Sequence, residues 1–204
     1  MTEDEGKEIK VILVGMSGTG KTNLINAMVG KKFDSDVIST TTSSFVHKIM
    51  IINNKKYPLE IWDTAGQERY RSLTELFIKD SDIVIFVYDI TSRNSFEEID
   101  YWVTIVKNIL GESPIFWLAG NKKDLFLEEV INEEEGQGKA EEIGAFFKLT
   151  SAKTGIGIND FIEQLLEEFI KKNGTIKINN NEKEENKGQR LNSIMSDIPK
   201  KKCC

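Results

Sequence analysis

The stretch Gly15-Met16-Ser17-Gly18-Thr19-Gly20-Lys21-Thr22 decides the fold, because of what stands on either side of it. An apolar run precedes it at residues 11–14, and apolar residues at helical spacing follow over 24–29. A glycine-rich turn between a strand and a helix lets successive backbone N–H groups curl around an oligophosphate. In that arrangement the Lys21 ammonium neutralises the β- and γ-phosphates, and the Thr22 hydroxyl coordinates Mg²⁺. A turn that carries a lysine by chance would not explain the flanking strand and helix, so the stretch predicts a nucleoside triphosphate site.

Apolar patterning places this stretch at the start of an alternating series of strands and helices. We expect strands over residues 8–14, 43–52, 57–62, 83–88, 115–119 and 146–149, and helices from the glycine-rich stretch to about residue 29 and over 68–79, 95–110, 128–143 and 160–170. The polar residues 53–56 form a hairpin turn. The pattern predicts an α/β fold of the P-loop NTPase type, with a doubly wound, six-stranded, mostly parallel sheet and one antiparallel edge strand. The ligand of such a sheet lies at the C-terminal ends of its strands.

Composition and charge limit the function classes. A chain of 204 residues suffices for one domain with a tail. The net charge of −6 combines +3 over residues 173–204 with −9 before them, so the body shows no bias toward nucleic acid. No apolar run reaches the ~18–20 residues that span a bilayer, and the acidic N-terminus lacks the plan of a secretory signal. We expect a flexible N-terminus over 1–7, one domain over 8–172 and a disordered tail over 173–204.

Three residues after the third expected strand suit the phosphate end of such a site. The Asp63 carboxylate can hold Mg²⁺ through a water, as the acidic partner of Thr22. Gly66 offers a backbone N–H to the γ-phosphate with no Cβ in the way, and the Gln67 amide can orient a water for in-line attack. Taken alone, Asp63–Gly66 is also an ordinary turn; beside the glycine-rich stretch, it favours phosphate chemistry.

Two further motifs follow the last two strands and suit a base. Asp124, in the stretch Asn121-Lys122-Lys123-Asp124, can accept hydrogen bonds from the adjacent N1–H and 2-amino donors of guanine. Adenine lacks that pair of donors and would leave the carboxylate unsatisfied, a difference of several kcal/mol. Ser151-Ala152-Lys153 can complete the pocket with backbone N–H groups. Each motif is weak alone, but their shared place at the sheet edge predicts a guanine nucleotide.

Together these motifs make the sequence similar to the small GTPases of the Ras superfamily, and within it to the Rab family. The resemblance covers residues 8–172 nearly continuously and includes the last two residues. Its pieces are GMSGTGKT at 15–22, WDTAGQERYRSLT at 62–74, VYDIT at 87–91, SFEEIDYW at 95–102, NKKD at 121–124, SAK at 151–153 and CC at 203–204. RYRSLT, VYDIT and the pattern SF-x-x-I-x-x-W favour Rab over Ras, Rho or Arf.

The resemblance implies a role for each matching residue. Phe33 packs against the guanine ring, and Thr40 reaches Mg²⁺ with its hydroxyl and the γ-phosphate with its N–H when GTP is bound. Gln67 is the catalytic residue. The implied metal ligands are Thr22, Thr40 and Asp63. The implied nucleotide-contacting residues are Gly15, Ser17, Gly18, Thr19, Gly20, Lys21, Thr22, Asn23, Phe33, Thr40, Gly66, Asn121, Lys122, Asp124, Ser151, Ala152 and Lys153.

The resemblance also implies partners, with one departure from the family pattern. Phe45, Trp62 and Phe77 match an aromatic trio that Rab effectors contact, although all three are also compatible with a place in the core. Further implied partners are an exchange factor, a GTPase-activating protein, a GDP-dissociation inhibitor and a prenylation escort protein, acting on a monomer. Rab proteins usually have Ile-Gly after Thr40, whereas this chain has two threonines at 41–42. The first of these is the fallback metal ligand.

The two cysteines of the chain, Cys203 and Cys204, are its last residues and follow three lysines. A disulfide framework is therefore excluded, and a reducing compartment is expected. By resemblance to Rab proteins, the pair carries two geranylgeranyl groups. Two lipid chains suffice for stable anchoring, and each lysine adds roughly 1 kcal/mol of attraction to an anionic leaflet. The expected location is the cytoplasmic face of an intracellular membrane, with a cytosolic pool. Two unmodified thiols are the alternative.

Three functions fit these residues to different degrees. The first is a GTP-hydrolysing switch in vesicle trafficking, whose segments order around the γ-phosphate and Mg²⁺ and relax after hydrolysis. The second is a GTP-holding membrane scaffold whose threonine-rich 40–42 segment no longer switches. The third, a kinase for a small metabolite, has no acceptor-binding lid in the sequence and leaves the terminal cysteines unexplained.

Overall fold

The computed structural model describes residues 8–35, 40, 44–64 and 76–174. Within them the elements are β1 (Ile9–Val14), α1 (Lys21–Met28), β2 (Ser44–Ile52), β3 (Lys55–Asp63), β4 (Ile83–Asp89), α3 (Arg93–Glu97), α4 (Ile99–Leu110), β5 (Ile115–Asn121), the 3₁₀ helix η2 (Lys123–Glu128), α5 (Glu133–Ile143) and β6 (Phe146–Leu149). A last helix covers residues 158–174. The chain divides into two compact units, Met1–Glu163 and Gln164–Cys204, and all these strands lie in the first.

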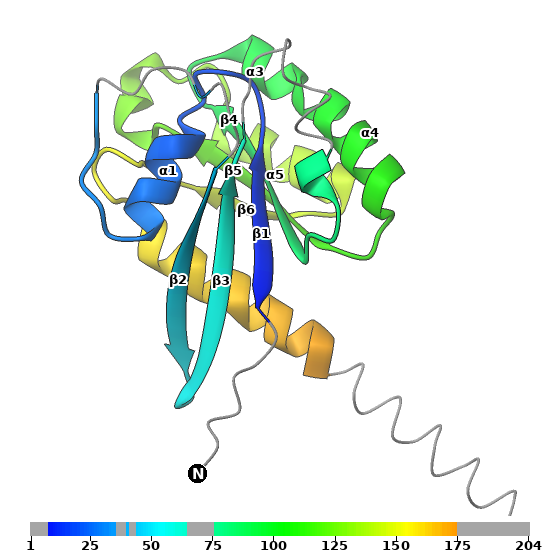
Figure 1. Ribbon diagram of the computed structural model, residues 1–204. Helices are drawn as coiled ribbons and strands as arrows, with labels where there is room; N and C mark the ends of the chain where they lie inside the picture. Colours follow the sequence, from blue (N-terminus) through cyan, green and yellow to red (C-terminus); the bar gives the residue numbers. More distant parts are fainter. Residues whose placement is uncertain (1–7, 36–39, 41–43, 65–75, 175–204) are drawn as a thin grey trace, which may run out of the picture. The chain divides into compact units, whose positions relative to one another are not determined.

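The six strands form one sheet in the order β2-β3-β1-β4-β5-β6 (Figure 1). β2 pairs antiparallel with β3, and every other neighbouring pair is parallel. All seven residues of β4 and of β5 are buried, as expected for parallel strands covered on both faces. The predicted fold class is therefore confirmed, including its antiparallel edge strand.

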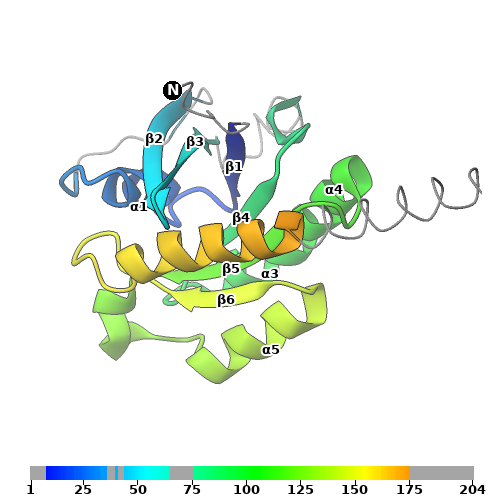
Figure 2. The ribbon, with the colours of Figure 1, turned by 90° about the horizontal axis from the view of Figure 1, so that it is seen from below.

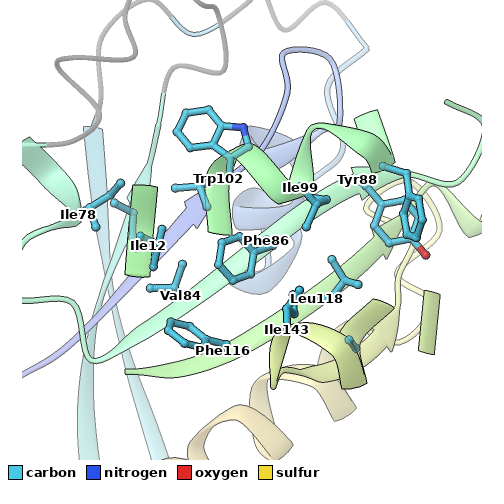
Figure 3. Packing of buried hydrophobic residues seen from close by; sticks show 14 of the residues in the cluster. Ile12, Ile78, Val84, Phe86, Tyr88, Ile99, Trp102, Phe116, Leu118 and Ile143 are labelled. Carbon is cyan, nitrogen blue, oxygen red and sulfur yellow. The ribbon is translucent and has the colours of Figure 1, made fainter. Parts of the chain in front are cut away.

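Large side chains fill one face of this sheet (Figure 3). Phe86 of β4 and Phe116 of β5 pack with ring centroids 5.9 Å apart. Trp102 of α4 is fully buried in the same cluster, to which α5 contributes Ala140 and Ile143. Figure 2 shows α5 beside β6. This packing fixes β4 and β5, and β5 ends at Asn121, one of the residues predicted to contact the base.

The β2–β3 hairpin has a tighter turn than the sequence predicts. Lys55 and Lys56 belong to β3, so only Asn53 and Asn54 form the connection. Both have positive φ, at 51° and 61°. Two consecutive left-handed residues match the right-handed twist of the flanking strands, and asparagine tolerates that conformation better than most residues. The predicted four-residue turn missed this preference.

Two predicted helices differ from the observed helices in where they begin or are interrupted. The expected helix over 95–110 is two helices, α3 and α4, which meet at Glu98. The expected helix over 128–143 is η2 followed by α5, which begins after Asn132. The Asn132 side chain accepts the Glu135 backbone N–H at 2.8 Å, an N-cap that the acidic run obscured in the sequence. Of the helix expected over 68–79, only 76–79 are described, and 76–78 are helical.

Candidate nucleotide-binding site

The glycine-rich stretch links the C-terminal end of β1 to α1, as predicted (Figure 1). Gly15 has φ 147°, and a Cβ there would lie 2.2 Å from the Val87 carbonyl oxygen. Gly20 has φ 89° and precedes the first residue of α1, and a Cβ there would lie 2.6 Å from Asn121 Nδ2. Side chains are excluded at both positions, so the backbone of the loop can follow this tight path only with glycine.

The Lys21 side chain lies inside the glycine-rich loop and reaches back to its first residues. Its Nζ donates hydrogen bonds to the carbonyl oxygens of Gly15 at 2.8 Å and Met16 at 2.9 Å. Burial lowers the pKa of Lys21 to about 8, although the nearby Asp63 carboxylate acts in the opposite direction. Among the described residues, no carboxylate forms an ion pair with this ammonium. A desolvated cation held by neutral carbonyls is suited to an anionic ligand.

Three oxygen-bearing side chains meet at the first turn of α1. The Thr22 hydroxyl donates to Asp63 Oδ2 at 2.7 Å, and Thr40 Oγ1 lies 2.9 Å from Thr22 Oγ1 and 3.4 Å from Asp63 Oδ2. The other carboxylate oxygen of Asp63 is buried without a hydrogen-bond partner in the described part of the chain. Burial is the main cause of a raised pKa at Asp63. Hard oxygen donors with an unsatisfied carboxylate oxygen fit Mg²⁺.

Asn121 joins the loops around the opposite end of the site. Its Nδ2 donates to the Thr19 carbonyl oxygen at 2.9 Å, which ties β5 to the glycine-rich loop. Its Oδ1 accepts the Ala152 backbone N–H at 3.2 Å and the Thr150 hydroxyl at 3.3 Å. The side chain is 1% exposed. In this arrangement Asn121 joins the end of β5 to two loops and has little surface left for a ligand.

Asp124 is held in place from the last loop. Its Oδ1 accepts the Ser151 hydroxyl at 2.6 Å, and the Lys153 ammonium lies 4.0 Å from Oδ2. Lys122 adopts a left-handed conformation with φ 68°, and its ammonium forms an ion pair with Asp89 at 2.7 Å. A carboxylate fixed on one side by a hydroxyl keeps lone pairs for the adjacent N–H donors of a purine.

The Asn23 side chain forms hydrogen bonds with the protein backbone. Its Nδ2 donates to the Asp34 carbonyl oxygen at 2.9 Å, and its Oδ1 accepts the Asp34 backbone N–H at 3.2 Å. The amide therefore fixes the segment that carries Phe33, whose ring is 42% exposed at the rim of the site. The sequence predicted direct contact between Asn23 and the nucleotide; Asn23 lies at the cavity, and both ends of its amide also bond to the Asp34 backbone.

These residues enclose a cavity of about 330 Å³. The predicted nucleotide-contacting residues that line it are Ser17, Gly18, Gly20, Lys21, Thr22, Asn23, Phe33, Thr40, Asn121, Lys122, Asp124, Ala152 and Lys153. Gly15, Thr19 and Ser151 are absent from the lining, and the last two support it by hydrogen bonds. Four lining residues were missed by the sequence reasoning: Asp34, Ser35, Thr64 and Leu125.

Thr64 and Leu125 could have been found by their position. Each follows directly on a predicted site residue, at the end of β3 and within η2. The Thr64 hydroxyl donates to the Leu13 carbonyl oxygen at 2.6 Å and so joins β3 to β1 beneath the phosphate loop. Asp34 and Ser35 lie in a polar segment with no periodicity, and the Asn23 contact to the Asp34 backbone helps to fix this segment at the cavity.

The predicted aromatic trio forms a continuous stack beside the site. The ring centroids of Phe45 and Trp62 are 4.9 Å apart, and those of Trp62 and Phe77 are 5.1 Å apart. Phe45 is 45% exposed, and the other two are partly buried. The trio is therefore exposed at its Phe45 end and part of the packing at its other end, and its contact with effectors stays a prediction.

Several predicted residues lie outside the described residues. They are Gly66 and Gln67 at the phosphate end, the threonines at 41–42 and the terminal cysteines Cys203 and Cys204. Their roles stay predictions, as do the domain boundaries after residues 7 and 172. In the part of the chain that is described, no helix is both long and apolar enough to cross a bilayer.

The geometry and a comparison with known families agree on the class of this protein. A cavity that joins a buried lysine, a carboxylate with two threonine hydroxyls, and a second carboxylate beyond Asn121 matches the predicted division into phosphate, metal and base ends. The sequence model of the Ras family matches residues 10–171, which covers all six strands except Ile9. The chain therefore belongs to the Ras family of small GTPases, whose members bind GTP or GDP with Mg²⁺.

Proposed function

We propose that this protein is a GTP-hydrolysing switch of the Rab type, anchored to an intracellular membrane and acting in vesicle trafficking. The observation that carries the switch is the position of Thr40. Its hydroxyl lies 2.9 Å from Thr22 and 3.4 Å from Asp63, although 18 residues separate it from Thr22 along the chain. Thr40 is thus joined to the metal end of the cavity by contacts that a bound metal would replace.

The residues of the chain divide the work of binding. Lys21 supplies a fixed cation to the phosphates, and the loop from Gly15 offers its backbone N–H groups. Asp124 reads the base, and Asn121 holds the loops on both sides of it together. When Mg²⁺ is bound at Thr22, Thr40 and Asp63, it neutralises charge that develops on the phosphates. Gln67 is proposed to orient the attacking water.

Single-turnover hydrolysis of GTP tests the enzymatic part. We expect slow turnover of the isolated protein, because much of the catalytic charge stabilisation in this class is supplied by an activating partner. The Gln67→Leu variant should bind GTP normally and hydrolyse it at least tenfold more slowly. An unaltered rate in this variant would remove Gln67 from its role.

The alternative, a scaffold that holds GTP without switching, is favoured by the threonines at 41–42, where Rab proteins usually have Ile-Gly. Limited proteolysis of the GDP form and of the form with a non-hydrolysable GTP analogue separates the two functions. A switch should show different cleavage around residues 34–45 in the two forms. Identical digestion patterns would favour the scaffold.

The membrane part rests on the sequence of the tail and on the Rab-like motifs. A tagged protein expressed in cells should be found on an intracellular membrane with a cytosolic pool. The Cys203→Ser/Cys204→Ser double variant, which keeps the neighbouring lysines, should be entirely cytosolic. Membrane association of this variant would show that lipidation of the two cysteines is not the anchor.

A further inference from the structure

An exposed apolar surface lies next to the base end of the cavity, in the segment between β5 and α5. Phe126 is 61% exposed, Leu127 88% and Val130 48%. The described residues contain ten exposed large apolar side chains, and three of them lie between residues 126 and 130. Single exposed apolar residues are ordinary, but a cluster of them on a monomer marks an interaction site. We call the side chains of Phe126, Leu127 and Val130 the apolar platform.

The backbone beneath the platform is held firmly. The Lys123 backbone N–H donates to the Thr150 carbonyl oxygen at 3.0 Å, and the Lys123 ammonium pairs with Glu129 at 2.8 Å. The N–H groups of Val130 and Ile131 both donate to the Ile90 carbonyl oxygen, at 2.9 and 3.1 Å. The apolar side chains are thus presented to solvent by a fixed backbone, which lowers the entropy cost of docking a partner on them.

The charge around the platform is acidic and uncompensated. Glu128, Glu133 and Glu134 are exposed, and within the described residues none of them has an ion-pair partner. The neighbouring Glu129 and Glu135, in contrast, are paired with Lys123 and Arg93. An apolar centre with an acidic rim complements a ligand that has apolar side chains and flanking positive charges.

We propose that the apolar platform docks a segment of a partner protein whose apolar side chains are flanked by Lys or Arg. An anionic membrane surface is disfavoured because it would meet three free carboxylates. A second copy of this chain, joined through the same face, is disfavoured because it would bring those carboxylates against their own copies. The proposal concerns a surface outside the cavity and stands whether or not the protein hydrolyses GTP.

Site-directed photocrosslinking in cells tests which molecule docks there. The variants Leu127→p-benzoylphenylalanine and Ile51→p-benzoylphenylalanine form a matched pair, because Ile51 of β2 is also exposed, at 66%, but lies far from the platform in sequence and outside the acidic rim. We expect a protein crosslinked at position 127 but not at position 51, with the reacted peptide containing apolar residues beside Lys or Arg. Crosslinks to lipid, to the chain's own tail or to a second copy, or none above the position 51 control, would overturn the proposal.

Binding of the crosslinked sequence, made as a fluorescent synthetic peptide, gives the second measurement. The double variant Phe126→Ser/Leu127→Ser should bind it at least tenfold more weakly than the unaltered protein, and Glu133→Lys/Glu134→Lys should weaken it severalfold. The control Ile49→Ser/Ile51→Ser, which also removes two exposed apolar side chains, should bind within twofold of the unaltered protein. Equal losses in the control and in the platform variant would overturn the assignment. Unchanged thermal melting and unchanged GDP affinity establish that the platform variant is folded.

Discussion

The two ends of the cavity are built differently. At the base end the polar side chains have protein partners: Asn121 bonds to two loops, Asp124 to Ser151, and Lys122 to Asp89. At the phosphate end, Lys21 is buried against neutral carbonyls, and one oxygen of Asp63 has no partner in the described part of the chain. The base end is assembled before a ligand arrives, whereas the phosphate end is completed by the ligand.

This difference shows that the phosphate end lowers the stability of the folded protein. Burying an ammonium and a carboxylate without a direct ion pair costs several kcal/mol, and well-packed apolar residues would stabilise the fold more. The shifted pKa values of Lys21 and Asp63, both caused mainly by burial, record that cost. Perturbed groups of this kind cluster at functional sites. The phosphate end is thus the part of the cavity where folding stability is given up for ligand binding.

The largest effect is expected from Lys21→Met. Loss of a charge-assisted contact to phosphate of about 2–4 kcal/mol should weaken GDP binding by roughly 30- to 1,000-fold. The nucleotide-free protein should keep or gain thermal stability, because a desolvated charge is replaced by an apolar side chain of similar length. Calorimetric titration with GDP and thermal melting measure the two quantities. Lys153→Met, at an exposed lysine of the same cavity, is the control and should lose much less affinity. Strong destabilisation of the nucleotide-free Lys21 variant would contradict this account of the phosphate end.

Asp124→Asn should come next and should alter selectivity more than stability. An asparagine can still accept the Ser151 hydroxyl through its amide oxygen, so the loop should remain in place. It cannot accept two hydrogen bonds from the adjacent donors of guanine, and we expect about 2–3 kcal/mol of discrimination to be lost. Displacement of a bound fluorescent nucleotide by GTP and by ATP measures the ratio of the two affinities. A variant that keeps full preference for guanine would show that the base is read elsewhere.

Asn121→Ala tests whether the base end is preassembled. The change leaves the buried Thr19 carbonyl and Ala152 N–H without their partner, which should lower the free energy of unfolding by about 1–3 kcal/mol even without nucleotide. Denaturant unfolding of the nucleotide-free protein provides the measurement. The matched change Thr40→Ala at the phosphate end should cost less than 1 kcal/mol in the same assay. If both changes cost the same, the two ends do not differ in the way described.

The sequence predicted most of the fold because its signals are local. Short apolar runs such as residues 83–88, rich in β-branched residues, favour buried strands, and the glycines at 15 and 20 are required by backbone geometry that a Cβ would prevent. The sequence did not predict that the Asn23 amide bonds to the Asp34 backbone, or that Asp34 lines the cavity. Both depend on a contact between α1 and a segment without periodicity. The cap at Asn132 was likewise hidden, since a run of glutamates follows it directly.

The smallest change in stability is expected from the packing between α5 and β5 behind the base end. Gly136 lies in α5 where a Cβ would be 2.5 Å from the Tyr88 hydroxyl oxygen, and a Cβ at Gly120, next to Asn121, would be 2.7 Å from the same atom. That hydroxyl is buried without a partner among the described residues, and Figure 3 shows it at the end of the Tyr88 ring. The phenol therefore fills a space that only glycines leave open, directly behind β5. The helix should be sensitive to any added atom at this point.

Gly136→Ala should consequently destabilise the protein by about 1–2 kcal/mol, because overpacking costs 1–3 kcal/mol and outweighs the better helix propensity of alanine. Gly138→Ala, two residues on in the same helix with nothing within 4 Å of the added Cβ, is the matched control and should stabilise by about 0.5–1 kcal/mol. Adding Tyr88→Phe to Gly136→Ala should restore part of the loss, since the nearest atom is removed; the Phe147 ring, 2.6 Å from the same Cβ, prevents complete recovery. Denaturant unfolding of the unaltered protein, of Gly136→Ala, of Tyr88→Phe and of the double variant gives the coupling energy between positions 88 and 136. A coupling energy near zero would mean that α5 shifts freely, and that the base end is not held from behind by Tyr88.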